Sequence, residues 1–277
     1  MPGLDELVIH PASKNILTRL QGNPPQSLLL SGPKGLGLHQ IAAHLFAAPI
    51  AAELSPQDAK ERPDENGTIS VETVRRLYEQ TRAMQTKQQV IIIDDADRMS
   101  KGAQSAFLKL LEEPAAHTLF ILTSHHPDTL LPTILSRVQH TVVRPATADQ
   151  TQALIERLNV QDAKKQAQLH YIAEGLPAEI IRLVEDEEQF AMRAGFINDA
   201  RQLLQGDTYQ KTVIIQKYRS DRAAALRLVD SAIAILRRTV STKPQQQLIG
   251  QLEQLLEVRE HIASNYSPSL QLMQFVL

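Results

Sequence analysis

The sequence predicts an α/β fold in which a doubly wound parallel sheet is followed by an all-helical C-terminal part. Three short apolar runs, at residues 27–30, 90–93 and 119–122, have the length and composition of buried strands. Helical periodicity at 71–82 and 103–111 separates these runs. Strands that alternate with helices form parallel sheets with helices on both faces, so this pattern predicts the fold class.

Strand signals end at Pro145, and every later periodic segment spaces its apolar residues three and four apart. Short helices interrupted at Gly175 and Pro177 precede two longer amphipathic stripes, which bury against other helices either as plain core or as an oligomerisation surface. The stripes consist of Leu226, Val229, Ile233, Leu236 and Val240, and of Leu248, Leu252, Leu255 and Ile262. The expected domains are an α/β domain at 1–145, a helical lid at 146–188 and a C-terminal helical domain at 189–277.

The composition is that of a folded, soluble protein. Apolar residues make up 43% of the 277 residues and charged residues 22%, which is ordinary globular usage. No apolar run reaches the roughly 18 residues of a membrane span, and residues 1–10 lack an export pattern. The absence of cysteine excludes disulfides and thiolate metal sites, which fits a reducing compartment and leaves only His and carboxylate side chains as possible metal ligands. We expect a cytoplasmic protein.

The net charge of -2 excludes a strongly basic nucleic-acid-binding surface over the whole chain. Residues 191–277 nevertheless carry 11 basic against 7 acidic side chains. A surplus of this size is typical of a solvated surface, although it also permits contacts with phosphate groups.

A glycine-rich loop, GPKGLGLH at residues 32–39, lies between the first expected strand and a helix-favouring stretch at 40–48. Its glycines permit a nest of backbone N–H groups at a helix N-terminus, the context of a phosphate-binding loop. A working loop carries Lys where Leu38 stands, to neutralise phosphate charge, and Ser or Thr where His39 stands, to ligate Mg²⁺. The residues expected in a degenerate nucleotide site that binds no nucleotide are Gly32, Gly35, Gly37, Leu38 and His39. A turn that merely joins strand to helix is the plainer interpretation.

Asp94 and Asp95 end the second apolar run, in the position of a Walker B element. In such an element an Asp holds a metal-bound water and an adjacent Glu orients the attacking water. Asp95 is one methylene shorter than Glu, which sets its carboxylate back by roughly an ångström and can cost on the order of a hundredfold in rate. We expect hydrolysis to be impaired here as well, although acids that end a strand are also common without any function.

His125 and His126 follow the third apolar run, and the nearby sequence offers no third ligand for a metal. Adjacent side chains that leave a strand point in different directions. We expect a loop with two exposed histidines and no metal site.

Ser136 and Arg137 follow a short helical pattern that Pro132 opens, so we expect Arg137 to project from the domain surface. An exposed Arg ordinarily has no function. Its planar guanidinium, however, suits the stabilisation of charge on a phosphoryl group of another subunit, which is the role of an arginine finger.

Five segments within the first 180 residues carry a resemblance to a known family. They are LSGPKG at 30–35, ISVETVRRL at 69–77, VIIIDDADRMS at 90–100, AFLKLLEEP at 106–114 and LPTILSR at 131–137. They resemble the bacterial clamp-loader AAA+ subunits of DNA polymerase III, in which a Ser-Arg-Cys segment holds the finger. Ser136 and Arg137 match that segment, whereas Val138 replaces the cysteine. The resemblance implies an AAA+ RecA-like domain, a helical lid and a C-terminal collar that joins subunits.

Four features of the ATP-hydrolysing members are missing: the Lys-Thr pair of the loop, the Walker B Glu, a set of zinc-binding cysteines and a sensor Arg in the lid. The corresponding positions hold Leu38 and His39, Asp95, the cysteine-free segment 51–67 and the turn at 175–178. The chain therefore resembles the rigid delta-prime members, which do not hydrolyse ATP.

The resemblance implies a scaffold subunit that donates Arg137 to the ATP site of a neighbour during sliding-clamp loading in DNA replication. The implied partners are gamma/tau-type and delta-type subunits, the sliding clamp and primer-template DNA, with ATP and Mg²⁺ only in neighbouring subunits and no membrane. Two alternatives stay open: an active AAA+ ATPase with an atypical loop, and a stand-alone DNA-binding or adaptor protein on the same fold.

Overall fold

The computed structural model describes residues 3–64, 67–81 and 87–276. The chain divides into two compact units, Met1–Val184 and Glu185–Leu277. The first unit holds the sheet and eight α-helices among its described residues, and the regular elements described in the second unit are all helical. The further division expected at residue 145 stays a prediction.

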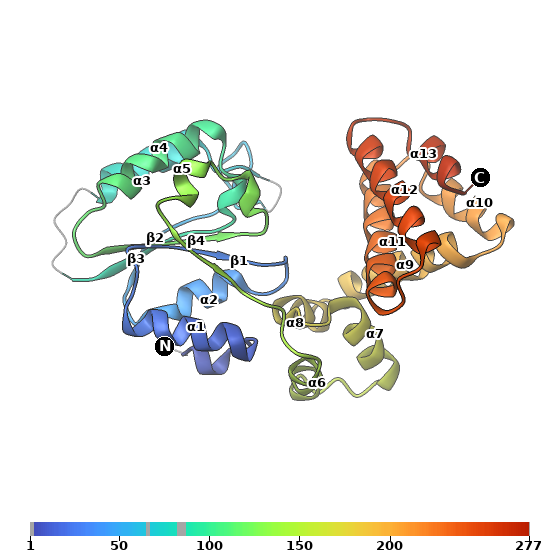
Figure 1. Ribbon diagram of the computed structural model, residues 1–277, viewed down its shortest axis with the longest axis horizontal. Coiled ribbons are helices and arrows are strands. Elements are labelled where there is room, and N and C mark those ends of the chain that lie inside the picture. Colours follow the sequence, from blue (N-terminus) through green and yellow to red (C-terminus); the bar gives the residue numbers. More distant parts are fainter. Residues whose placement is uncertain (1–2, 65–66, 82–86, 277) are drawn as a thin grey trace. The chain divides into compact units, whose positions relative to one another are not determined.

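A five-stranded parallel sheet with the strand order β2-β3-β4-β1-β5 forms the centre of the first unit (Figure 1). The strands are β1 (Ser27–Ser31), β2 (Ile50–Leu54), β3 (Gln89–Ile93), β4 (Thr118–Ser124) and β5 (Gln139–Val142). The predicted parallel sheet is confirmed, and β1, β3 and β4 are buried along their whole length. The sequence pattern missed β2 and β5 because these edge strands are mostly exposed and lack an apolar run.

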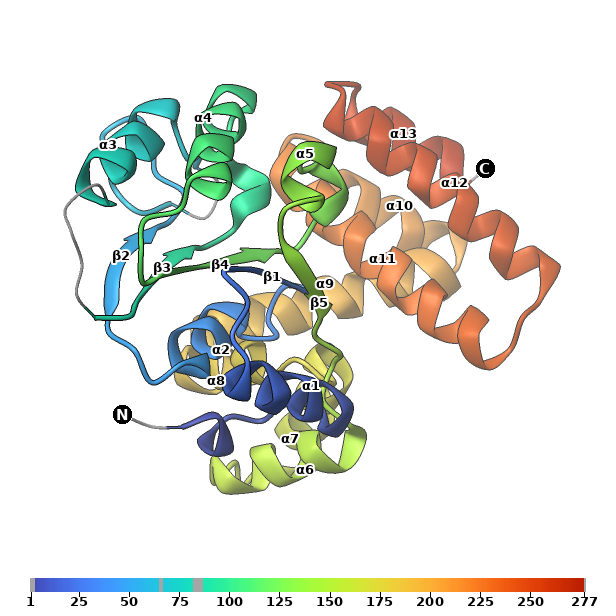
Figure 2. The same ribbon diagram turned by 60° about the vertical axis from the view of Figure 1, so that its left-hand side comes forward.

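Helices cover both faces of the sheet (Figures 1 and 2). One face carries α1 (Pro11–Gly22) and α2 (Leu38–Leu45), and the other carries α3 (Val71–Thr81), α4 (Lys101–Glu112) and α5 (Pro132–Leu135). Successive strand residues point to opposite faces, so Leu28 and Leu30 pack under α2 while Leu29 packs on the α4 side. Short 3-10 turns occur at Leu4–Glu6, Ala96–Arg98 and Pro127–Thr129.

The observed helix limits differ from the limits that the periodicity predicts where capping residues and prolines act. The helix expected at 40–48 begins at Leu38 and ends at Leu45, because Phe46 is already extended, ahead of Pro49. Ser100 caps α4 by accepting a hydrogen bond from the Ala103 N–H at 3.1 Å, which extends the expected 103–111 helix at its start. Helix α3 ends at Thr81, and Arg82, the last residue of the expected helix, lies outside the described residues.

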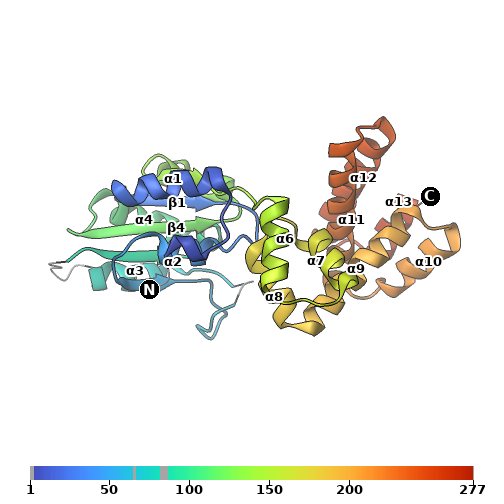
Figure 3. The same cartoon turned by 90° about the horizontal axis from the view of Figure 1, so that it is seen from below.

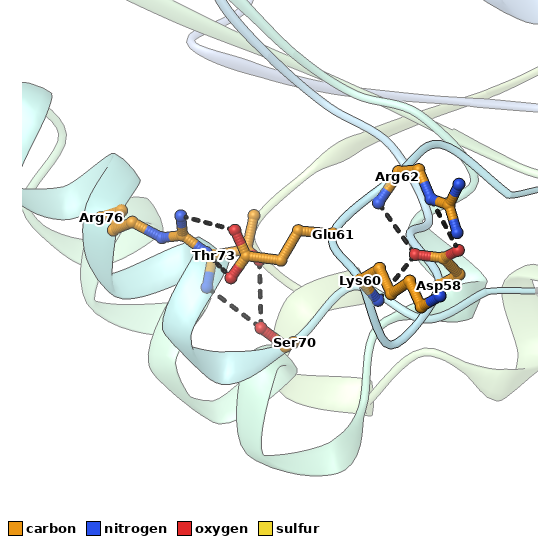
Figure 4. Close-up of polar contacts among 7 residues, drawn as sticks. All are labelled: Asp58, Lys60, Glu61, Arg62, Ser70, Thr73 and Arg76. Carbon is orange, nitrogen blue, oxygen red and sulfur yellow. Dashed lines mark hydrogen bonds and ion pairs between the residues drawn. The ribbon is translucent and has the colours of Figure 1, made fainter.

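The cysteine-free connection between β2 and α3 is held by carboxylate-centred contacts (Figure 4). Asp58 accepts hydrogen bonds from the backbone N–H groups of Lys60 (2.7 Å) and Arg62 (3.0 Å). Glu61 pairs with both terminal nitrogens of Arg76 on α3, at 3.0 and 3.2 Å. This connection is thus tied to the first unit, although residues 65–66 within it lie outside the described part.

Three short helices complete the first unit: α6 (Ala148–Arg157), α7 (Ala163–Ala173) and α8 (Pro177–Glu185), which Figure 3 shows from below. Thr147 and Gln150 form a capping box at the start of α6. The turn before α8 needs a glycine, since Gly175 has φ 76° and an added Cβ would lie 2.8 Å from the Pro145 Cβ.

The second unit consists of α9 (Glu187–Gln205), α10 (Thr208–Lys217), α11 (Arg222–Thr242), α12 (Gln246–Ala263) and α13 (Pro268–Val276). Helix α11 packs against α9 and α12, as its apolar stripe predicts. Inside this unit the buried Asp199 accepts hydrogen bonds from the Lys217 Nζ and the Tyr218 hydroxyl, both at 2.6 Å. Among the described residues of the whole chain, no helix combines the length and apolarity needed to cross a bilayer.

Candidate functional site

The glycine loop after β1 adopts a conformation that requires its glycines. Gly35 and Gly37 have φ values of 90° and 84°, in the left-handed region that side chains with a Cβ rarely adopt. An added Cβ on Gly35 would stand 2.8 Å from the Cβ of Glu179. The loop is therefore shaped both for a tight turn and for close approach by α8.

The two positions that matter most in a phosphate-binding loop are engaged in other contacts. Leu38, the first residue of α2, is 3% exposed and belongs to the core under that helix, together with Leu36. The Nε2 atom of His39 lies 2.5 Å from Oε1 of Glu53 on β2. A core side chain and a His–Glu pair thus occupy the places where an ammonium and a hydroxyl would face a nucleotide.

A pocket of 220 Å³ lies at the carboxyl ends of the strands, where ligands bind in open α/β sheets. It is lined by Lys34, Gly35, Gly37, Leu38, His39, Gln40, Asp94, Asp95, His125, Ala178, Glu179 and Arg182. The structure therefore brings the glycine loop and the Asp94-Asp95 pair together, as the sequence predicted. It adds the start of α8, where Arg182 Nη2 lies 2.6 Å from Glu179 Oε2.

Helix α8 sits directly on the glycine loop. The Glu179 N–H donates to the Gly35 carbonyl at 3.1 Å, and Leu176 packs against the apolar core beside α2. An added Cβ on Gly37 would lie 3.3 Å from the Ala178 Cβ. Helix α8 thus contacts the loop through its backbone and through the small side chain of Ala178.

Thr123, near the end of β4, links the two acidic residues that follow β3. Its hydroxyl donates to Asp94 Oδ1 at 2.6 Å and accepts a hydrogen bond from the Asp95 N–H at 2.9 Å. Thr123 is not among the site residues that the sequence predicts. The end of the third apolar run pointed to this position, because β3 and β4 are adjacent parallel strands whose carboxyl ends meet at one edge of the sheet.

His125 joins the glycine loop to Asp95. Its Nδ1 lies 2.8 Å from the Gly32 carbonyl oxygen, which only accepts, so Nδ1 carries a hydrogen. Its Nε2 lies 3.3 Å from Asp95 Oδ1. Because Nδ1 is the donor, this second contact is favourable only when a proton lies between Nε2 and the carboxylate.

The surroundings of Asp95 disfavour its negative charge. Burial raises the pKa of the Asp95 carboxyl, and the charge of Asp94 raises it further, whereas His125 opposes the shift. The expectation of two exposed histidines is correct for His126 and wrong for His125, because Gly32 and Asp95 draw the His125 ring into the site. No three His, Cys, Asp or Glu side chains gather as a metal site in the described ranges.

Arg137 lies on the surface after α5 and does not line the pocket. Its Nη1 donates to the Thr133 carbonyl at 3.1 Å and to the Ser136 hydroxyl at 3.3 Å. Its Nη2 lies 2.9 Å from Glu112 Oε1, at the end of α4. The structure thus brings together the LLEEP and ILSR segments, whereas the following residue, Val138, is buried in the core.

Comparisons with known proteins find sequence similarity to subunits of DNA polymerase III. The profile described as DNA polymerase III, delta subunit, matches residues 11–147. DNA polymerase III subunit delta-prime of Pseudomonas aeruginosa is 31% identical over 208 residues, which cover 63% of this chain and 61% of that protein. Subunit tau of Bacillus subtilis is 32% identical over 167 residues, which cover 53% of this chain and 29% of that protein. The matched region therefore spans less than two thirds of the length of either relative.

Solved structures show the same fold. A DNA polymerase III gamma subunit-related protein from Thermotoga maritima has a TM-score of 0.59 at 17% identity, over 95% of this chain and 97% of that one. A mutant form of Thermotoga maritima RuvB has a TM-score of 0.51 at 14% identity, over 87% of this chain and 83% of that one. The fold is of the AAA+ type, and the sequence matches show that the chain is similar to the delta-prime and tau subunits of DNA polymerase III, as expected of a clamp-loader subunit.

Proposed function

We propose that this chain is a non-hydrolysing, delta-prime-like subunit of a DNA polymerase III clamp loader, which serves as a scaffold and supplies Arg137 to the ATP site of a neighbouring subunit. One observation carries the proposal. The glycine loop is closed by contacts within the chain, through Leu38, His39 and α8, while the Arg137 guanidinium stands on the surface.

The residues around the pocket do not fit a magnesium triphosphate. Leu38 offers a buried apolar side chain in place of an ammonium, and the ring of His39 is paired with Glu53. The carboxylates of Asp94, Asp95 and Glu179 line the same pocket and outnumber its two cationic side chains, Lys34 and Arg182. The 220 Å³ volume is also below the roughly 300–1,000 Å³ of typical ligand pockets.

The position of Arg137 supports a role in trans. Its side chain is 38% exposed, and its contacts to Thr133, Ser136 and Glu112 keep it on the outer surface of the first unit. An arginine finger supplied by another subunit is worth about 10³–10⁵ in rate. The chain would thus activate hydrolysis that it cannot perform.

The partners we propose are gamma/tau-type and delta-type subunits, the sliding clamp and primer-template DNA, in the cytoplasm. The similarity to subunits named delta-prime and tau supports this assignment. The helical residues 189–277 would form the collar that joins the subunits. Contacts with DNA would be mostly to phosphates, shared among the subunits and sensitive to salt.

The test of the finger is Arg137→Ala in the complex assembled with the partner subunits from the same host. We expect lower DNA-stimulated ATP turnover, because the adjoining site loses about 10³–10⁵ in rate, with assembly unchanged by size-exclusion chromatography. Arg75→Ala, at an exposed arginine of α3, is the matched control and should leave turnover intact. Normal turnover in Arg137→Ala would refute the finger assignment.

The test of the inert loop uses the isolated chain. Calorimetry with Mg-ATP should show no binding at micromolar concentrations, and steady-state hydrolysis should be absent. Micromolar affinity would contradict our interpretation of Leu38 and His39, and turnover by the lone chain would establish an active ATPase. A DNA band shift without any partner would instead favour a stand-alone DNA-binding protein.

A further inference from the structure

The Arg137 guanidinium is held by acceptors of its own chain at both terminal nitrogens. Nη1 faces the Thr133 carbonyl and the Ser136 hydroxyl, and Nη2 faces the Glu112 carboxylate at 2.9 Å. A guanidinium grips a phosphate best through two parallel N–H groups. In this arrangement at least one terminal nitrogen must leave its present acceptor before a bidentate grip through both can form.

Glu112 stands where helix stability does not favour it. It is the last residue of α4, and a negative charge near a helix C-terminus is disfavoured by the helix dipole. Its carboxylate is 52% exposed, so no burial or packing requirement explains the acid. The contact that the structure shows for this carboxylate is the ion pair with Arg137, which follows the next helix, α5.

We propose that Glu112 is a latch that parks Arg137 and releases it when a nucleotide-loaded neighbour docks. This inference rests on the proposed function, because it takes Arg137 to be the finger. Glu112 neutralises the guanidinium while the surface is free. When the neighbour docks, the phosphate oxygens of its nucleotide replace the Glu112 carboxylate as the partner of Arg137. An exposed ion pair of this kind is weak, so the latch changes the equilibrium between Arg137 paired with Glu112 and Arg137 released from it by a factor of about five at most.

The test compares four variants in the assembled complex. Glu112→Gln removes the charge and keeps the shape, and Glu113→Gln makes the same change at the adjacent exposed glutamate as the matched control. Arg137→Ala and the double variant Glu112→Gln/Arg137→Ala show whether Glu112 acts through the arginine. The first measurement is the affinity for a fluorescent, non-hydrolysable ATP analogue, and the second is the separate determination of kcat and KM for ATP.

We expect Glu112→Gln to tighten analogue binding and to lower KM by about two- to fivefold without changing kcat, because the ion pair no longer competes with phosphate. The gain in analogue affinity should shrink as ionic strength rises, since salt screens exposed ion pairs. Glu113→Gln should match the wild type, and the double variant should match Arg137→Ala.

Three kinds of outcome would overturn the latch. Weaker analogue binding or a lower kcat in Glu112→Gln would mean that Glu112 aims the finger instead of restraining it, and unchanged binding would mean that the ion pair has no influence. These results are separate from the finger assignment, which fails if Arg137→Ala by itself leaves turnover unchanged. A gain from Glu112→Gln that persists in the Arg137→Ala background would also refute the latch.

Discussion

Asp95 shows how a single residue departs from the local preferences of its chain. Its backbone is left-handed (φ 48°), and its carboxylate lies between Asp94 and His125 at the end of β3. Non-glycine residues adopt this conformation rarely, although Asp and Asn tolerate it better than most. Strain of this kind concentrates at functional sites, and here it turns the second acid toward His125.

The raised pKa of Asp95 predicts how stability depends on pH. The folded state favours the protonated carboxyl, so its stabilising contribution is present below the ordinary Asp pKa of about 3.9 and is lost as pH rises through the raised folded pKa. Asp95→Asn cannot ionise and keeps a residue type that tolerates positive φ. We therefore expect a higher urea midpoint than the wild type at pH 7, with the difference shrinking as pH falls toward 4.

Urea denaturation at several pH values measures this effect, with Asp128→Asn at an exposed site as the control. The control should change the midpoint less, and without the same pH trend. A midpoint for Asp95→Asn that is equal to or below that of the wild type at neutral pH would mean that the contact with His125 outweighs the burial of charge.

At the scale of elements, the fit of α8 on the glycine loop depends on the smallness of Gly35, Gly37 and Ala178. The Gly35 carbonyl accepts a hydrogen bond from α8, so any Cβ at Gly35 pushes away the helix that also bonds to it. The same loop therefore shapes the pocket and positions helix α8. In contrast, the glycines inside α9 and α12 meet no such neighbour.

Two alanine substitutions test this contrast. Gly35→Ala should lower the free energy of unfolding by about 1–3 kcal/mol, because it combines a positive φ with a close contact. Gly195→Ala, at an exposed position within α9 with no atom within 4 Å of an added Cβ, should raise it by about 0.5–1 kcal/mol. Urea denaturation measures the free energy of unfolding of both variants. An unchanged value for Gly35→Ala would show that α8 can move away from the added Cβ at little cost in stability.

At the scale of the whole molecule, the second unit has a hydrophobic core of its own. Helix α11 contributes Leu228, Val229 and Leu236 to that core, and Phe196 packs against Tyr218 with ring centroids 5.8 Å apart. Asp221 caps α11 by accepting a hydrogen bond from the Ala224 N–H at 2.9 Å. A separate core and helix ends that are locally capped allow this unit to fold independently.

A fragment of residues 186–277 should therefore be helical by circular dichroism and should unfold in one cooperative thermal transition. Asp199→Ala in the fragment should cost about 1–3 kcal/mol, because the buried Tyr218 hydroxyl loses its acceptor. Asp230→Ala, at an exposed carboxylate that pairs with Arg259, is the control and should cost less than about 1 kcal/mol. A fragment with no cooperative transition would show that the unit needs the rest of the chain.

The three buried strands and the helices that follow β1 and β3 could be predicted from the sequence because they depend on local patterns. The run Val90–Ile93 has to be buried wherever it lies, and Ser100 caps whatever helix follows it. The edge strands β2 and β5 could not be predicted, because their exposed faces need no apolar residues and only pairing with β3 and β1 makes them strands.

By itself the sequence determined the α/β class, the helical C-terminal part, the glycine loop that lacks its Lys and Thr, and the surface position of Arg137. Only the tertiary structure decided which side chains meet: His125 with Gly32, Thr123 with Asp94, Arg137 with Glu112 and α8 with the loop. The physical reason is the distance along the chain over which each kind of interaction acts. Residue type and spacing set backbone conformation over a few residues, whereas these contacts join positions 25 to 144 residues apart, whose approach depends on strand order and on the burial of the whole core.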